Sequence, residues 1–162
     1  MTRINSRSKG SAFERQIATD LRDWLGDEWT VTRNQTDRQG GQVAGAAGEF
    51  TVTCGDRHLP FCIECKAVER FDYRHLWVSP VRGPLPAFWR QAKRQALIVM
   101  RRPMLIVKKN HGPILVVMWP DDVSRLLVAT DARMRLRLGD DIVSVLRWDD
   151  FIATAFPSEL HL

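Results

Sequence analysis

The sequence contains no apolar run of the roughly 18 to 20 residues that a membrane-spanning helix needs. It has only three cysteines, Cys54, Cys62 and Cys65, and its first residues do not follow a signal-peptide pattern. An odd and small number of cysteines argues against a framework of disulfides. The chain also has no internal repeat, linker or change in composition that would divide it. We therefore expect a single soluble domain over 1–162, in a reducing cytoplasm and without a membrane partner.

Two of the cysteines, in Cys62-Ile-Glu-Cys65, have a spacing that occurs in zinc sites. On a strand, however, these two side chains would face opposite sides, and the sequence offers no second ligand pair at a suitable spacing. The pattern therefore favours packing of two small apolar side chains over metal binding.

Basic residues outnumber acidic ones, with 24 Lys and Arg against 19 Asp and Glu, for a formal net charge of +5. This balance favours a polyanionic partner such as nucleic acid but says nothing about the fold. Part of the charge lies within 1–10, where Arg3, Arg7 and Lys9 occur in a short polar stretch. We expect a basic N-terminal arm there, which either contacts phosphates or is ordinary solvated surface.

The first helix is predicted by apolar residues at helical spacing, namely Phe13, Ile17, Leu21, Trp24 and Leu25. Ser11 and Glu14 have the spacing of a capping box, in which each side chain bonds the backbone N–H of the other residue. We therefore expect a helix over 11–25 that ends at Gly26. This cap alone would explain why a glutamate occurs at position 14, without a catalytic role.

A glycine-rich stretch follows a short β-branched strand over 29–33. Residues 34–48 contain four glycines together with Arg38 and show neither helical nor strand periodicity. A loop of this length inside a domain is usually functional or disordered, and small residues let the backbone approach a ligand. Arg33 and Arg38 are candidates for phosphate contacts, or else are ordinary surface charges. The loop leads the chain to Glu49.

A hairpin is predicted over 49–66. The β-rich runs 50–54 and 59–66 flank a Gly-Asp pair that is typical of turns. Symmetric pairing around this turn sets Cys54 opposite Leu59. The same register, counted back along the strands, sets Glu49 opposite Glu64.

Directly opposed carboxylates would lie on one face of this hairpin, with Cβ atoms about 4.5–5.5 Å apart. Lys66 projects from the same face as Glu64 because side chains alternate along a strand. Opposed like charges are destabilising, and a divalent cation is the simplest compensation for Glu49 and Glu64. Two alternatives stay open: a solvated face on which Glu64 and Lys66 pair, and a loop of another length that separates the acids.

The remainder of the chain continues an α/β pattern after an irregular, proline-containing connection over 67–86. The expected elements are a helix over 87–97 with Gln91 and Gln95 on one face, apolar strands over 104–108 and 114–119, a helix that starts at Pro120, a strand over 134–138, a strand or helix over 142–146 and a short helix over 149–156. Together with the earlier elements they predict a mixed β-sheet flanked by helices.

Several motifs, taken in order, resemble the PD-(D/E)xK nuclease superfamily and, within it, the archaeal-type and phage Holliday-junction resolvases. These are Lys9-Gly followed by Glu14-Arg15, the acid Glu49, the run Ile63-Glu-Cys-Lys66 and the glutamine-bearing run Trp89-Arg-Gln-Ala-Lys-Arg-Gln95. The resemblance spans about the first hundred residues and implies a restriction-endonuclease-like core. It also implies a homodimer in the cytoplasm of a prokaryotic or phage-infected cell.

Carried onto this sequence, the resemblance makes Glu14, Glu49 and Glu64 acids of a metal site and Lys66 its base, with Gln91 facing the site. The implied cofactor is Mg²⁺, with Mn²⁺ as a substitute, since Mg²⁺ prefers oxygen ligands and retains several waters. Where the family usually has aspartate, this chain has Glu49, whose side chain is one methylene longer.

The implied function is metal-dependent hydrolysis of branched DNA, with Holliday junctions as the substrate, in recombination or repair. Two other functions remain open. One is a restriction-like, nicking or repair endonuclease of the same superfamily. The other is a DNA-binding recombination accessory protein that has lost catalysis through the change at Glu49.

Overall fold

The computed structural model describes residues 6–34, 47–69, 72–74, 76, 83–126 and 133–160, and the strands in these ranges form two sheets. The smaller sheet is antiparallel and has the order β1 (Thr30–Arg33), β2 (Phe50–Cys54) and β3 (Arg57–His58). The larger sheet has the order β4 (Phe61–Val68), β5 (Arg102–Lys109), β6 (Ile114–Met118), β8 (Asp141–Arg147) and β7 (Met134–Leu138). Its β4–β5 pair is parallel and its other pairs are antiparallel, so the sheet is mixed.

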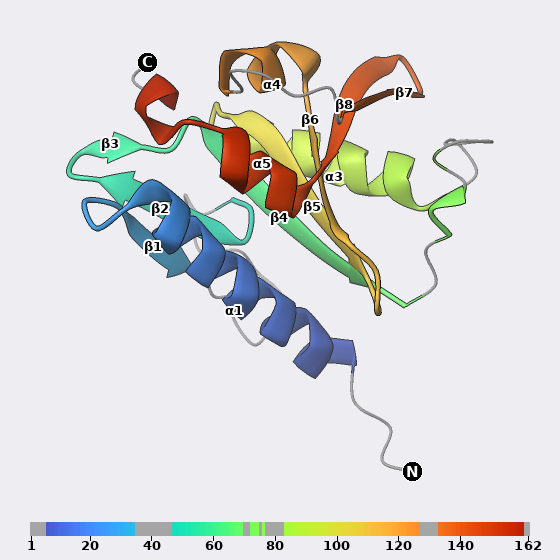
Figure 1. The fold of residues 1–162 in the computed structure, drawn as a ribbon, viewed down its shortest axis with the longest axis horizontal. Coiled ribbons are helices and arrows are strands. Elements are labelled where there is room, and N and C mark those ends of the chain that lie inside the picture. Colours follow the sequence, from blue (N-terminus) through green and yellow to red (C-terminus); the bar gives the residue numbers. More distant parts are fainter. Residues whose placement is uncertain are drawn as a thin grey trace.

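Helices cover both faces of the larger sheet (Figure 1). On one face lie α1 (Ser6–Leu25) and α5 (Trp148–Thr154), and on the other lies α3 (Leu85–Ile98). The short α4 (Pro120–Leu126) packs near the 3₁₀ turn η2 (Pro157–Leu160). The predicted architecture, a mixed sheet flanked by helices, is confirmed.

The inner strand β6 is buried throughout and its neighbour β5 is buried over most of its length, as their continuous apolar character predicts. Side chains that alternate along β5 contribute to two separate cores. Met104 and Ile106 pack in the core that α1 and α5 close, whereas Leu105 and Val107 pack in the core beneath α3. This double burial makes the sheet a rigid platform for groups at its edge.

The chain that enters β2 lies against the free edge of β4, the outermost strand of the larger sheet. There the backbone N–H of Glu49 donates to the carbonyl oxygen of Ile63 across 2.7 Å. α3 connects β4 to β5, which makes those two strands parallel and places the helix over one face of β4. The β4 edge therefore lies where the smaller sheet, α1 and α3 approach one another.

The predicted hairpin register is wrong. The turn consists of Gly55 and Asp56, so that Cys54 pairs with Arg57 and not with Leu59. Gly55 has φ +59, which a two-residue hairpin turn requires. Pairing with β2 ends after Leu59, because Pro60 has no N–H to donate and the chain crosses to the larger sheet as β4. Glu49 is consequently not paired with Glu64 across a ladder.

The predicted cap of the first helix is also wrong. The helix begins at Ser6 and places Ser11 inside it, although it ends before Gly26 (φ +86) as expected. The Ser11 hydroxyl accepts hydrogen bonds from Arg15 and Arg33, the latter on β1. A tertiary partner thus replaces the local cap, and Glu14 is left available for a contact outside its own helix.

The remaining described elements confirm the predictions with small shifts at their ends. The ambiguous segment over 142–146 is a strand, and the closing helix is α5. Most of the expected glycine loop, 35–46, and much of the connection over 67–86 lie outside the described residues. In the part of the chain that the structure describes, no helix combines the length and apolar character needed to cross a membrane.

Candidate active site

Glu64 and Lys66 lie on the face of β4 that α3 covers. The Lys66 ammonium is 2.6 Å from Oε1 of Glu64, and the Gln91 amide of α3 donates to the same oxygen across 2.6 Å. Glu64 is only 4% exposed. A buried carboxylate is costly unless it is paired, and here a lysine two residues along the strand and a helix glutamine supply the partners. The sequence predicted this grouping of three residues.

Glu49 is held by its backbone at the edge of β4. Its N–H donates to Ile63, and its carbonyl oxygen accepts from the N–H of Asn34 across 2.9 Å. The pKa of Glu49 is raised from an ordinary 4.5 to about 7, first by burial and then by the charges of Glu64 and Glu14, against the opposing effect of Lys66 and Arg33. Glu64 of β4 and Glu14 of α1 therefore both act on Glu49, which lies just before β2.

Glu14 enters the site from α1 and forms an ion pair with Arg33 of β1. Both side chains are partly exposed. Arg33 is one of the predicted phosphate contacts, but in this structure its guanidinium is paired with the Glu14 carboxylate. Among the other candidates, Arg3 and Arg38 lie outside the described residues. Arg7 and Lys9 belong by backbone to α1, but their side chains also lie outside the described part.

Asn34 braces the segment that carries Glu49, a role that the sequence did not reveal. Its amide donates to the carbonyl oxygen of Gly48 across 3.1 Å, and its Oδ1 accepts from the Thr51 hydroxyl across 2.7 Å. These bonds join the two ends of the glycine-rich stretch. A lone asparagine at the start of a loop carries no periodic signal, so only its position before the glycines could have suggested it.

Gly48 is required by its close approach to β4. It has φ +75, and a Cβ there would lie 2.5 Å from the carbonyl oxygen of Ile63 and 2.9 Å from Sγ of Cys62. We expect Gly48→Ala to lower the free energy of unfolding by roughly 2–5 kcal/mol, from the left-handed backbone and the overlap together. Urea denaturation measures this.

Gly55→Ala is the matched control for that change. Gly55 has a similar φ of +59, but a Cβ there meets nothing within 4 Å. Only the backbone cost of about 1–2 kcal/mol should then appear. Equal destabilisation by the two substitutions would mean that β4 does not crowd Gly48.

The cysteines pack as predicted, on opposite sides of β4. Cys62 contacts the small residues Ala47 and Ala96, whereas Cys65 belongs to the core beneath α1. Burial raises the pKa of the Cys62 thiol to about 11 and that of Cys65 well above its ordinary range. Both are free thiols, and because they lie on opposite sides of the strand they are not arranged to bind one zinc ion together.

The donor set of the site fits a hard divalent cation. Within the described residues no three acidic, histidine or cysteine side chains are arranged to hold a metal. Mg²⁺ nevertheless needs only one or two protein carboxylates because it retains several waters. After burial, the charge of Glu64 is the next cause of the raised pKa of Glu49, and a cation bound by both carboxylates would relieve this repulsion.

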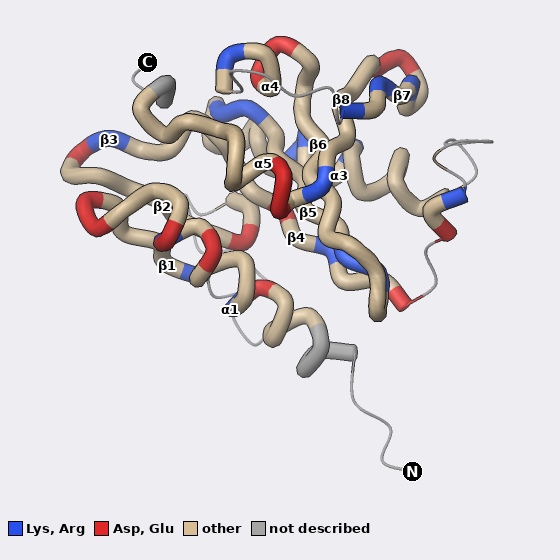
Figure 2. Tube along the Cα trace, viewed as in Figure 1, with Lys and Arg blue, Asp and Glu red and all other residues tan. Residues whose placement is uncertain are grey.

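Charge alone does not mark a DNA-binding face. Figure 2 shows basic and acidic residues interspersed over the described elements. A net charge of only +5 does not by itself identify a nucleic-acid partner.

The chain is similar to a known family, to a phage protein and to a solved structure. Residues 5–151 match the sequence profile of a family described as "Phage putative PDDEXK endonuclease". Protein D14 of Escherichia phage T5 is 28% identical over 120 residues, which are 74% of this chain and 74% of that protein. The structure of Hjc, a Holliday junction resolvase from Archaeoglobus fulgidus, aligns with a TM-score of 0.40 at 12% identity, over 93% of this chain and 98% of Hjc.

Proposed function

Because the chain belongs to the phage PDDEXK endonuclease family, we propose that it is a metal-dependent endonuclease that resolves branched DNA, with the Holliday junction as its substrate. The observation that carries this proposal is the grouping at the edge of β4. There the buried Glu64, paired with the partly exposed Lys66, lies within electrostatic reach of Glu49, whose pKa is raised to about 7. Such a perturbed carboxyl beside a second acid and a lysine is typical of a catalytic site.

Glu49 and Glu64 would hold Mg²⁺, with Mn²⁺ as a substitute, and Glu14 would contribute a third acid from α1. When bound, the cation would polarise the scissile phosphate and lower the pKa of an attacking water. Lys66 would orient that water or stabilise negative charge on the phosphate oxygens. Arg33 balances the charge of Glu14 and would be free to contact phosphate if that ion pair opens.

Gln91 positions Glu64, since its amide donates to Oε1 across 2.6 Å. We expect Gln91→Ala to lower the rate of cleavage roughly 10- to 100-fold, the usual cost of removing a group that orients a metal ligand. Single-turnover cleavage kinetics measure this. Gln91→Glu is a second variant for comparison. It retains the size of the side chain but replaces the donating amide with a further carboxylate next to Glu64. A Gln91→Ala rate equal to wild type would remove Gln91 from the site.

The choice of branched DNA depends on the ordered motifs Lys9-Gly, Glu14-Arg15, Glu49, Ile63-Glu-Cys-Lys66 and the glutamines of α3. A resolvase must cut two opposed strands, so we also propose a homodimer with two sites. Sedimentation velocity on the full chain tests this part separately. A monomer at the concentrations that support cleavage would contradict it.

Cleavage of matched substrates tests the proposed function. A four-way junction, a duplex of the same sequence and a single strand are incubated with the protein in Mg²⁺ and in EDTA. We expect junction cleavage only with Mg²⁺ and a clear preference for the junction over the duplex. Duplex cutting without that preference would indicate another endonuclease of the family, and tight junction binding without cutting would indicate an accessory protein.

A further inference from the structure

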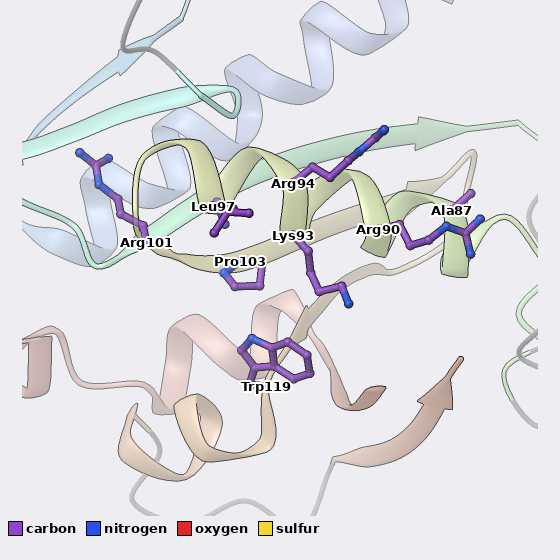
Figure 3. A pocket seen from close by; sticks show the side chains of 9 residues that line it. Ala87, Arg90, Lys93, Arg94, Leu97, Arg101, Pro103 and Trp119 are labelled. Carbon is purple, nitrogen blue, oxygen red and sulfur yellow. The ribbon is translucent and has the colours of Figure 1, made fainter. Parts of the chain in front are cut away.

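A basic pocket of about 800 Å³ lies against α3, beside the acidic site described above. It is lined by Ala87, Arg90, Lys93, Arg94, Ala96, Leu97, Arg101, Pro103 and Trp119. Four of these nine residues are cations and none is acidic. Figure 3 shows Lys93 pointing toward the Trp119 ring, while the guanidinium ends of the three arginines point outward, away from Trp119.

Trp119 is fixed in place by its neighbours. Its ring meets Trp89 edge-on, with the centroids 5.0 Å apart at an interplanar angle of 80°. Lys93 lies 5.9 Å from the centroid of the Trp119 ring and is itself held 2.5 Å from Asp141. The ring is only partly buried and forms part of the pocket wall. A preorganised aromatic surface in a cationic pocket is suited to stacking with a planar group that is attached to an anion.

The arginines at the rim are available for such a ligand. Arg90 and Arg94 are exposed, and within the described residues no carboxylate pairs with Arg90, Arg94 or Arg101. Arg90 and Arg94 lie on the same helix as Gln91, which bonds Glu64. Arg101 acts electrostatically on Cys62, which is also influenced by Glu64. The pocket therefore lies next to the acidic site along α3.

We propose that this pocket binds single-stranded nucleic acid, with an unpaired base stacked on Trp119 and the flanking phosphates held by Arg90, Arg94 and Arg101. The three arginines have no carboxylate partner among the described residues and favour a polyanion, and the indole surface favours a nucleobase over a plain duplex backbone. The inference deepens the proposed function, on which its biological meaning rests. It gives the enzyme a means to select DNA whose strands are locally unpaired, as at a branch point.

Equilibrium binding in EDTA tests the pocket independently of cleavage. The probe is a short fluorescein-labelled oligothymidylate, read by fluorescence anisotropy at fixed salt, with a duplex of equal length for comparison. We expect Trp119→Leu to weaken binding of the single strand about 5- to 150-fold, the usual effect of losing one stacked base. Duplex affinity should change little.

A base-deleted probe separates stacking from structural damage, because Trp119 also packs on Trp89. Abasic positions in the oligonucleotide should weaken binding to wild type and to Trp119→Phe, which retains an aromatic ring. They should not weaken the binding of the oligonucleotide to Trp119→Leu any further. The losses of affinity from the substitution and from the base deletion are then not additive. Independent, additive losses would overturn the proposal.

Charge variants complete the test. Arg94→Ala should weaken binding of the single strand and reduce the slope of log affinity against log salt by about 0.7. Arg135→Ala removes the same charge from an exposed position on β7, on the face away from α3, and should bind as wild type. Equal effects of the two substitutions would overturn the site. So would a Trp119→Leu variant that keeps its affinity for DNA but loses self-association in sedimentation velocity, which would make the pocket a contact between two copies.

Failure of this proposal is distinct from failure of the proposed function. If the wild-type protein cleaves junctions but Trp119→Leu binds single strands as tightly as wild type, the proposed endonuclease function stands and only the binding role of the pocket is wrong. Conversely, a chain that cleaves no DNA could still show the nonadditive loss between Trp119 and the base. The binding experiments therefore test the pocket, and the cleavage experiments test the proposed function.

Discussion

Lys66→Ala is expected to lower the rate of DNA cleavage by about 10²–10⁴-fold, the usual contribution of a positioned acid or base. Its ammonium lies 2.6 Å from the buried Glu64 carboxylate, so the substitution removes both a group for the attacking water and the charge that balances Glu64. Junction affinity in EDTA should stay within a few fold of wild type. Single-turnover cleavage and anisotropy measure the two quantities. Glu64→Ala should behave in the same way.

Lys108→Ala is the matched control. Lys108 lies on the neighbouring strand β5 but faces α1, where its ammonium is 3.0 Å from the Gln16 side chain. Its removal subtracts the same charge from the same sheet and should leave cleavage unchanged. If Lys66→Ala or Glu64→Ala retained normal cutting, the active site would lie elsewhere in the chain. A thermal melt of each variant shows whether lost activity comes from lost folding.

Substitutions of Glu49 are expected to have the second largest effect on the rate of DNA cleavage and to be the most informative. Glu49→Ala should lower cleavage by more than the roughly 10- to 100-fold cost of losing an outer-sphere partner. Glu49→Asp should retain or exceed wild-type activity, because it restores the residue that is usual in the superfamily. Cleavage titrated with Mg²⁺ measures both. Indifference to Glu49→Ala would remove this residue from the site.

The pH dependence of folding tests the environment of Glu49 in the metal-free protein. Its pKa is raised from 4.5 to about 7 by burial and by two acids, so the unfolded chain loses this proton at lower pH than the folded one. The contribution of Glu49 to stability is therefore greatest below its unfolded pKa and falls as pH rises toward about 7. Glu49→Gln cannot ionise and should escape this loss.

The stability of Glu49→Gln relative to wild type should thus increase by on the order of 2 kcal/mol between about pH 5 and about pH 8. Urea denaturation at both pH values in EDTA measures it. Added Mg²⁺ should stabilise wild type more at the higher pH, because binding requires the deprotonated carboxylate. A gap between variant and wild type that does not change with pH would mean that Glu49 titrates normally.

How far the site could be predicted depended on which residues share an element. Glu64 and Lys66 lie on one strand, and strict alternation along that strand placed them together without any knowledge of its partners. Gln91 was placed by the resemblance and by its position on a periodic helix. Local patterns of this kind survive folding because the element itself fixes them.

Relations between elements were less predictable. The Glu49–Glu64 register assumed a simple hairpin, but β4 takes its parallel partner β5 from beyond α3, some forty residues along the chain. The capping box assumed that Glu14 had a partner within its own helix, whereas the structure pairs it with Arg33 of β1. In both cases a contact distant in sequence prevailed over a local rule that was sound in itself.

The acids converge for a reason that sequence patterns did not contain. Glu49 reaches Glu64 through the edge of β4, by way of Gly48 and the bond from its own N–H to Ile63. Glu64 therefore acts electrostatically on Glu49, although the predicted register that set the two residues opposite each other was wrong.

Crystals of the protein soaked in Mn²⁺ and measured at the manganese absorption edge test the central claim most directly. We expect an anomalous peak from a manganese ion bound by the carboxylates of Glu49 and Glu64, and no peak in crystals of Glu64→Ala. A manganese ion bound elsewhere, or no bound ion at concentrations that support DNA cleavage, would contradict it.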